Sequence, residues 1–315
     1  MSLTTQQQNT WSIVLAAGDG ERLKPFVRQW LGYEKPKQYC AFVGTRSMLQ
    51  HTLDRADEIT PSQRKVIVVA RQHRERGWPQ GLKLRGGRLI VQPTNQGTAS
   101  AIFLALTYIR QEAPSAKVIL YPSDHFIYPE MRFQAVVRAA IAAADALPQK
   151  VVLLGVAANR PELDYGWIQP GSELRKIEGH SVKTAIRFKE KPAFESGAQA
   201  ASTAGGLWNT LVLAAQAELL WSLGQRRFPK LMEMLEQFAP NIGNEDEEEQ
   251  LNILYRKLGN HDFSSELLEK LPHQIAVIEL DGVVWSDWGR PERIRESLGQ
   301  MGKSLSLSRA YAKIG

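Results

Sequence analysis

Residues 13–25 read Ile-Val-Leu-Ala-Ala-Gly-Asp-Gly-Glu-Arg-Leu-Lys-Pro and decide the fold of the first half of this chain. The apolar run at their start predicts a buried strand, and this strand passes directly into a turn from Gly18 to Gly20. Glycine lets the backbone approach a ligand closely, and fixed cations follow at Arg22 and Lys37. Such a turn followed by cations suits a polyphosphate, so the sequence predicts a nucleotide-binding loop here.

Two common glycine-rich loops do not fit this stretch. A dinucleotide-binding fingerprint needs a third small residue three positions after Gly20, where Leu23 stands, and the next predicted strand, residues 65–70, ends without a carboxylate. A Walker A loop ends in Gly-Lys-Ser/Thr, and no such tripeptide follows the first strand or any other predicted strand. Both loop classes are therefore disfavoured.

The alternation of strand and helix patterns predicts an α/β fold. We expect a doubly wound, mostly parallel, Rossmann-like sheet with helices on both faces and a smaller C-terminal helical/β appendage. Short runs rich in Val, Ile or Leu predict strands at residues 12–16, 65–70, 88–92, 117–121, 150–156, 182–188, 274–280 and 283–285. Helical spacing predicts helices at residues 47–57, 97–111, 131–146, 211–223, 227–238 and 247–258. Residues 159–179 form a Gly/Pro-punctuated stretch, and residues 303–315 are expected to be a basic helix or frayed tail.

Composition excludes several classes of protein. The 315 residues are 43% apolar, which is enough for a large core, and no run approaches the roughly 18 apolar residues that span a bilayer. Residues 1–10 lack the pattern of a signal peptide, and the single cysteine, Cys40, excludes an internal disulfide and favours a buried structural thiol. We therefore expect a cytoplasmic protein with no membrane partner.

The charge of the chain suits small phosphorylated molecules. The net charge of +6 comes from scattered Lys and Arg residues, without a nucleic-acid-binding motif, so no nucleic-acid partner is predicted. The acidic run at residues 245–249 is interpreted as the solvated start of a helix, where negative charge complements the helix dipole.

Three motifs place polar groups at predicted strand or helix ends. Gln92, followed by Gly97 and Thr98, can read the edge of a base, although a plain helix N-terminus explains the same residues. Asp124 follows the strand at residues 117–121, where it offers a hard oxygen to Mg²⁺ or serves as a turn residue. Asp287, in Trp-Ser-Asp-Trp-Gly, follows the predicted strand at residues 283–285 and by itself is consistent with a simple hairpin.

A further set of residues suits a phosphorylated sugar. The Glu190 carboxylate and the Asn209 amide can hydrogen-bond sugar hydroxyls, and Lys191 at a strand end can hold a phosphate. A solvated strand end is the alternative interpretation of Glu190 and Lys191.

Taken in order, these motifs resemble the sugar-1-phosphate nucleotidyltransferase family. Its first loop reads roughly Leu-Ala-x-Gly-x-Gly-x-Arg-Leu-x-Pro and is followed by Pro-Lys, and the similarity extends from about Trp11 to Arg295. Pro-Ser-Asp-His at residues 122–125 and Trp-Ser-Asp at residues 285–287 are similar to the mannose-1-phosphate guanylyltransferase (GDP-mannose pyrophosphorylase) subfamily. The resemblance implies transfer of a nucleoside monophosphate from a nucleoside triphosphate, GTP above all, to a sugar 1-phosphate, mannose 1-phosphate above all, with release of pyrophosphate.

The resemblance also implies roles for individual residues, a metal and an assembly. Catalytic roles fall on Arg22, Lys37, Asp124, Lys191 and Asp287, with Asp124 and Asp287 as ligands of Mg²⁺. Nucleotide contacts fall on Ala16, Gly18, Gly20, Gln92, Gly97 and Thr98, and sugar contacts on Gly166, Glu190 and Asn209. The implied catalytic domain spans residues 11–240, with a nucleotide half at 11–157 and a sugar-phosphate half at 158–240. Residues 241–315 return Asp287 to the site, and a homodimer is a possible assembly.

The chain departs from the family pattern at several positions. Thr210-Leu211-Val212 follows Asn209 where the family usually has Ser/Thr-Gly-x-Phe, and Gly289-Arg290-Pro291 replaces Gly-Ser-Trp. Residues 26–33 lengthen the gap before Pro36 and are a candidate lid. Base and sugar preference stay open, and two other classes remain: a glycosyltransferase, which usually needs an Asp-x-Asp element absent from the central strand ends, and a non-catalytic nucleotide-sugar sensor.

Overall fold

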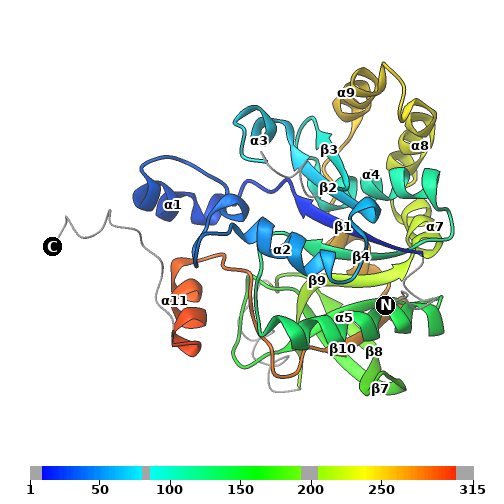
Figure 1. Cartoon of the computed structure of the whole chain (residues 1–315). Coiled ribbons are helices and arrows are strands. Elements are labelled where there is room, and N and C mark those ends of the chain that lie inside the picture. The colour runs from blue at the N-terminus through cyan, green and yellow to red at the C-terminus, as the bar shows by residue number, and fades with distance from the viewer. Residues whose placement is uncertain (1–8, 80–85, 193–204, 303–315) are drawn as a thin grey trace.

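A mixed β-sheet forms the centre of the molecule (Figure 1). The computed structural model describes residues 9–79, 86–192 and 205–302. Within them, nine strands follow the order β3-β2-β1-β4-β9-β6-β10-β8-β7. Their bounds are β1 Thr10–Ala16, β2 Lys65–Ala70, β3 Arg88–Gln92, β4 Lys117–Pro122, β6 Val151–Ala157, β7 Trp167–Ile177, β8 His180–Lys189, β9 Leu207–Gln216 and β10 Ile275–Glu279. β8 and β9 run opposite to the other strands, so the predicted α/β class with a mostly parallel sheet is confirmed.

Helices cover both faces of the sheet (Figure 1). One face carries α2 (Met48–Asp57) and α5 (Glu130–Ala146). The other carries α4 (Gly97–Glu112), α7 (Ala217–Arg227), α8 (Pro229–Phe238), α9 (Glu247–Lys257) and α10 (Phe263–Glu266). Beyond the sheet, α1 (Lys24–Leu31) and α11 (Pro291–Gln300) share a smaller apolar cluster, and the short α3 (Arg71–Glu75) follows β2.

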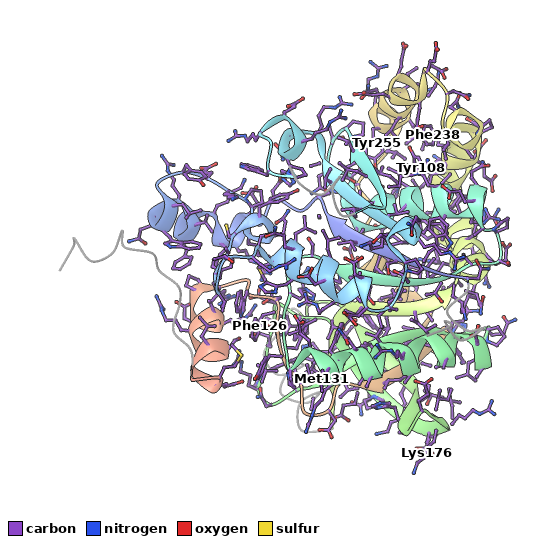
Figure 2. The ribbon with its side chains drawn as sticks, viewed as in Figure 1. Tyr108, Phe126, Met131, Lys176, Phe238 and Tyr255 are labelled. Carbon is purple, nitrogen blue, oxygen red and sulfur yellow. The ribbon has the colours of Figure 1, made fainter. Side chains whose placement is uncertain are left out.

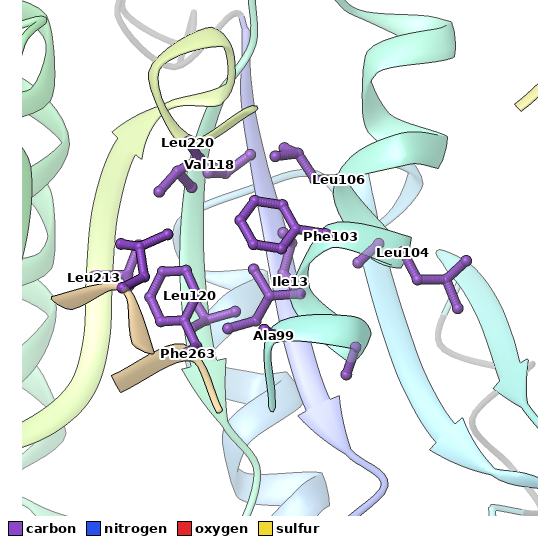
Figure 3. Close-up of a cluster of buried hydrophobic side chains, with 14 of the residues drawn as sticks. Ile13, Ala99, Phe103, Leu104, Leu106, Val118, Leu120, Leu213, Leu220 and Phe263 are labelled. Atoms are coloured by element: carbon purple, nitrogen blue, oxygen red, sulfur yellow. The ribbon is translucent and has the colours of Figure 1, made fainter. Parts of the chain in front are cut away.

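The larger core lies between the sheet and α4 (Figure 3). Ile13 and Leu120 point from β1 and β4 toward Phe103 of α4, and all three side chains are fully buried. Phe263 reaches the same cluster from α10, with its ring centroid 6.0 Å from that of Phe103. Each such side chain stabilises the fold by about 1.5–3 kcal/mol. The C-terminal part of the chain is thereby anchored on α4.

One predicted helix was wrong. Residues 211–223 were expected to be helical, but their first part belongs to β9, and α7 begins at Ala217. β9 lies between β4 and β6, so its side chains are covered on both faces, and residues 211–215 of it form a continuous apolar run. Such a run does not show the alternation by which a strand is distinguished from a buried helix.

Other differences concern segments without a clear apolar pattern. The Gly/Pro-punctuated stretch contains β7, an edge strand whose later residues are largely exposed. The candidate lid at residues 26–33 largely forms α1, whose Trp30 is buried with its ring 5.2 Å from that of Phe42. The expected helix or tail at residues 303–315 lies outside the described residues.

A small ribbon brings the two aspartate motifs together. β5 (Phe126–Tyr128) pairs antiparallel with β11 (Val284–Ser286), and Ile127 lies opposite Trp285. β5 begins two residues after Asp124, and β11 ends one residue before Asp287. The chain therefore returns over a long sequence distance to place Asp287 beside the end of β4.

Candidate active site

Lys37 is the residue that joins the two aspartate motifs. Its ammonium lies 2.9 Å from Asp124 Oδ2 and donates a hydrogen bond to the main-chain carbonyl of Asp287. The Lys37 side chain is only 7% exposed, so this charge is nearly desolvated and its interactions are strong. Burial by itself would raise the pKa of Asp124, but Lys37 and His125 hold it below its usual value.

Asp287 is held by a dense set of donors. Its Oδ1 accepts hydrogen bonds from Arg293 at 2.8 Å, Tyr165 at 3.0 Å and the Gly289 N–H at 2.9 Å, and its Oδ2 accepts one from Arg22 at 3.0 Å. Burial opposes ionisation, but Lys37 and Arg293 outweigh it and keep the pKa of Asp287 far below its usual range. The group is therefore a carboxylate at neutral pH.

The two carboxylates provide a donor set that fits Mg²⁺. No group of three or more His, Cys, Asp or Glu side chains suited to a metal occurs among residues 9–79, 86–192 and 205–302. Mg²⁺ is usually bound through one or two carboxylates together with substrate phosphates and water. Asp287 Oδ2 contacts Arg22, whose side chain is 47% exposed and can turn toward an anionic ligand. Asp124 and Asp287 are the residues that would hold the ion.

The loop after β1 is shaped for a close approach. A Cβ built on Gly18 meets no protein atom within 4 Å, whereas Gly20 has φ +63° and lies against Lys37. The Gln38 amide donates hydrogen bonds to the carbonyls of Ala16 and Gly18, at 3.1 Å and 2.7 Å. Gln38 therefore holds the loop in place, while no protein atom occupies the space where a side chain at Gly18 would lie.

The residues expected to read the base contact the C-terminal segment of this chain. The buried Gln92 amide oxygen accepts a hydrogen bond from Tyr255 at 3.4 Å, and Thr98 Oγ1 donates to Asp262 at 3.1 Å. A Cβ on Gly97, whose φ is +83°, would lie 2.2 Å from the carbonyl of His261. The glycine is thus required by the packing of residues 260–263 on the start of α4, and this packing agrees with the alternative interpretation of a plain helix N-terminus.

The predicted sugar residues lie together. The Asn209 N–H donates to the Gly166 carbonyl at 2.7 Å, and a Cβ on Gly166 would lie 2.5 Å from Glu190 Oε2. Lys191 pairs with Glu190 at 3.2 Å and is well exposed. Burial raises the pKa of Glu190, so its proton is held more tightly than that of a surface glutamate.

Leu211 occupies the position where the family pattern has glycine. Its φ is +54°, which is the left-handed conformation that glycine adopts without strain. The Asn209 side chain accepts a hydrogen bond from the Leu211 N–H at 3.0 Å and stabilises this local turn. The backbone shape of the motif is therefore present although its glycine is absent.

Sequence reasoning missed the charges around Asp287. Asp164 accepts hydrogen bonds from Arg293 at 2.8 Å and pairs with Arg290 at 2.8 Å and with Arg22 at 3.1 Å. Asp164 and Tyr165 stand directly before Gly166, a sugar contact implied by the resemblance, so their position in the sequence was a signal for them. Arg293 gave no such signal, because its partners are brought together only by the folded chain.

Comparison with known proteins identifies the family. The family model described as nucleotidyl transferase matches residues 11–302. This chain belongs to that nucleotidyl transferase family. The family recognised from the sequence is thereby confirmed.

Relatives within the nucleotidyl transferase family are longer than this chain. The xanthan biosynthesis protein XanB of Xanthomonas campestris pv. campestris is 30% identical over 74% of this chain and 45% of its own length. A mannose-1-phosphate guanylyltransferase of Escherichia coli is 26% identical over 93% of this chain and 62% of its own length. The chain therefore spans about half to three fifths of these two relatives.

Solved structures support the fold of the nucleotidyl transferase family. The crystal structure named mannose-1-phosphate geranyltransferase, from Thermus thermophilus, matches with a TM-score of 0.74 and 24% identity, over 91% of this chain and 79% of that one.

Within the part of the chain that the structure describes, no helix is both long and apolar enough to cross a bilayer.

Proposed function

We propose that this chain transfers a nucleoside monophosphate from a nucleoside triphosphate to a sugar 1-phosphate, with GTP and mannose 1-phosphate as substrates. The observation that carries this proposal is the contact of Lys37 with both aspartate motifs, beside the glycine loop and the open space at Gly18. The relative named mannose-1-phosphate guanylyltransferase supports the choice of base and sugar. The single, buried Cys40 suits a reducing compartment, which supports a location in the cytoplasm.

The mechanism needs positioning and charge compensation. A phosphate oxygen of the sugar 1-phosphate forms a bond to the α-phosphorus, while the bond from the α-phosphorus to the bridging oxygen breaks and pyrophosphate leaves. Lys37 and Arg22 would hold the triphosphate over Gly18, and Lys191 would hold the sugar phosphate near Glu190 and Asn209. Mg²⁺ held by Asp124 and Asp287 would offset the charge that develops on the phosphates. No covalent intermediate with the protein is required.

A pyrophosphate-release screen tests the proposal. Four nucleoside triphosphates are each combined with a panel of sugar 1-phosphates and Mg²⁺, and we expect the highest rate with GTP and mannose 1-phosphate. A higher rate with another pair of substrates would change the proposed base or sugar but would still support the nucleotidyl-transfer reaction. Nucleotide binding without turnover in every combination would contradict an enzyme and support a non-catalytic sensor.

A further inference from the structure

A cavity of about 560 Å³ lies apart from the glycine loop and the predicted sugar residues. Figure 2 shows Phe126 and Met131 in this region, between α11 and the start of α5. The cavity also contacts Phe42, Met48 and Trp288, so its walls are largely aromatic and methionine side chains. Its size and apolar lining are typical of sites for small organic molecules.

The charged residues that line the cavity favour an anion. Arg46, Arg55 and Arg132 line it, against one acidic side chain, Glu130. The Nε–H groups of Arg46 and Arg55 are buried and have no hydrogen-bond partner among the described residues. Arg46 pairs with Asp54 at 2.6 Å and Arg55 with Glu130 at 3.3 Å, so the free donors are their Nε–H groups, and the exposed Arg132 adds a further positive charge. Such donors beside an apolar space are suited to a carboxylate, sulfonate or phosphate on an apolar body.

One wall of the cavity is the ribbon that carries the two aspartate motifs. His125 and Trp288 line the cavity, and each directly follows one of the proposed metal ligands. The rings of Phe126 and Trp288 stack at 4.6 Å with an interplanar angle of 6°, and Trp285 Nε1 donates to His125 Nδ1 at 3.3 Å. A molecule in the cavity would therefore contact the residues that directly follow Asp124 and Asp287.

We propose that this cavity is a second ligand site, for a small molecule with an apolar body and one anionic group, whose binding lowers turnover through the β5–β11 ribbon.

Binding of 1-anilinonaphthalene-8-sulfonate, an aromatic anion, to the full chain tests the site. We expect a saturable rise in fluorescence at one dye per chain that persists with GTP and mannose 1-phosphate present. Arg132→Glu reverses an exposed charge at the cavity and should weaken binding about tenfold. Val43→Trp fills the space and should abolish binding. Arg175→Glu, on the exposed part of edge strand β7, is the matched control and should bind as the wild type does.

The outcomes separate this site from the proposed active site. Displacement of the dye by GTP, or unchanged binding in both Arg132→Glu and Val43→Trp, would overturn the second site. We expect saturating dye to lower wild-type turnover and to leave that of Val43→Trp unchanged, and equal turnover with and without dye would overturn the link to the ribbon. The binding measurements need no turnover, so they remain decisive even if the proposed reaction is wrong. Thermal unfolding of each variant shows that it is folded.

Discussion

Gly18 and Gly20 stand two positions apart in one loop, yet their surroundings differ. A methyl group at position 18 enters open space, so Gly18→Ala should leave the free energy of unfolding nearly unchanged. The same methyl group occupies the space proposed for the phosphates, so we expect nucleotide affinity to fall about tenfold or more. Isothermal titration with GTP and Mg²⁺ measures this loss. Gly299→Ala in α11, where a Cβ also meets nothing, is the control, and equal GTP affinity in both variants would contradict the assignment of the loop.

Leu211 allows a direct measurement of backbone strain. Glycine in a strand is normally less stable than alanine by about 0.5–1 kcal/mol. At φ +54° the order should reverse, because the left-handed conformation costs a non-glycine residue about 1–2 kcal/mol. We therefore expect Leu211→Gly to be about 1 kcal/mol more stable than Leu211→Ala in urea unfolding. The comparison cancels the loss of the leucine side chain, and an alanine variant that is the more stable of the two would show that the position is not strained.

The two aspartates should differ in what they contribute to stability. Asp124→Asn and Asp287→Asn are both expected to abolish turnover, but Asp287 is 9% exposed and pairs with Arg293, which is 5% exposed. Loss of one partner from such a pair costs about 3 kcal/mol. Asp124 is 34% exposed, and its partner Lys37 keeps the hydrogen bond to the Asp287 carbonyl, so Asp287→Asn should be the less stable variant. Near-normal turnover in both variants would refute the metal assignment.

The stability lost in Asp287→Asn should depend on pH, because the pKa of Asp287 is lowered in the folded state. A carboxylate with a lowered pKa in the folded state stabilises the fold above its unfolded pKa of about 3.9, and this contribution is lost as the pH falls toward the folded value. The stability gap between wild type and Asp287→Asn should thus be largest near neutral pH and should shrink below about pH 4. Urea unfolding at pH 7 and pH 3 measures it, and a gap independent of pH would contradict the charged network.

At the scale of the elements, the sequence predicted a strand correctly where the local apolar pattern alone defines it. β2 and β3 have the predicted bounds because each is a short run of apolar, mainly branched residues between polar turns. β9 was not predicted as a strand, because its apolar character comes from burial between β4 and β6, which the local sequence does not encode.

The candidate site shows the same limit. Asp124 was indicated by its place after β4, whereas Asp287 was singled out through the family resemblance. Arg22 lies 265 residues from Asp287, and no local pattern indicates that they form an ion pair. Charge networks of this kind depend on the crossing of distant segments, here the pairing of β5 with β11.

At the scale of the whole molecule, the described sheet does not divide at residue 240. β10 lies between β6 and β8, and four of its five residues are buried. Phe263 and His261 belong to the same C-terminal part of the chain and pack on α4. A chain that ends at residue 240 would expose the edges of β6 and β8 and the apolar face of α4, which favours aggregation.

We therefore expect a chain of residues 1–240 to lack a cooperative unfolding transition, although these residues contain the whole catalytic domain implied by resemblance. A chain of residues 1–302 retains β10, α10 and α11 and should unfold within a few degrees of the full chain. Calorimetry and near-ultraviolet circular dichroism of the two chains measure this. A cooperative, monomeric 1–240 fragment would show that residues 241–315 are a separable appendage. Loss of folding only in the shorter chain would mean that the segment that returns Asp287 to the site is also required to complete the sheet.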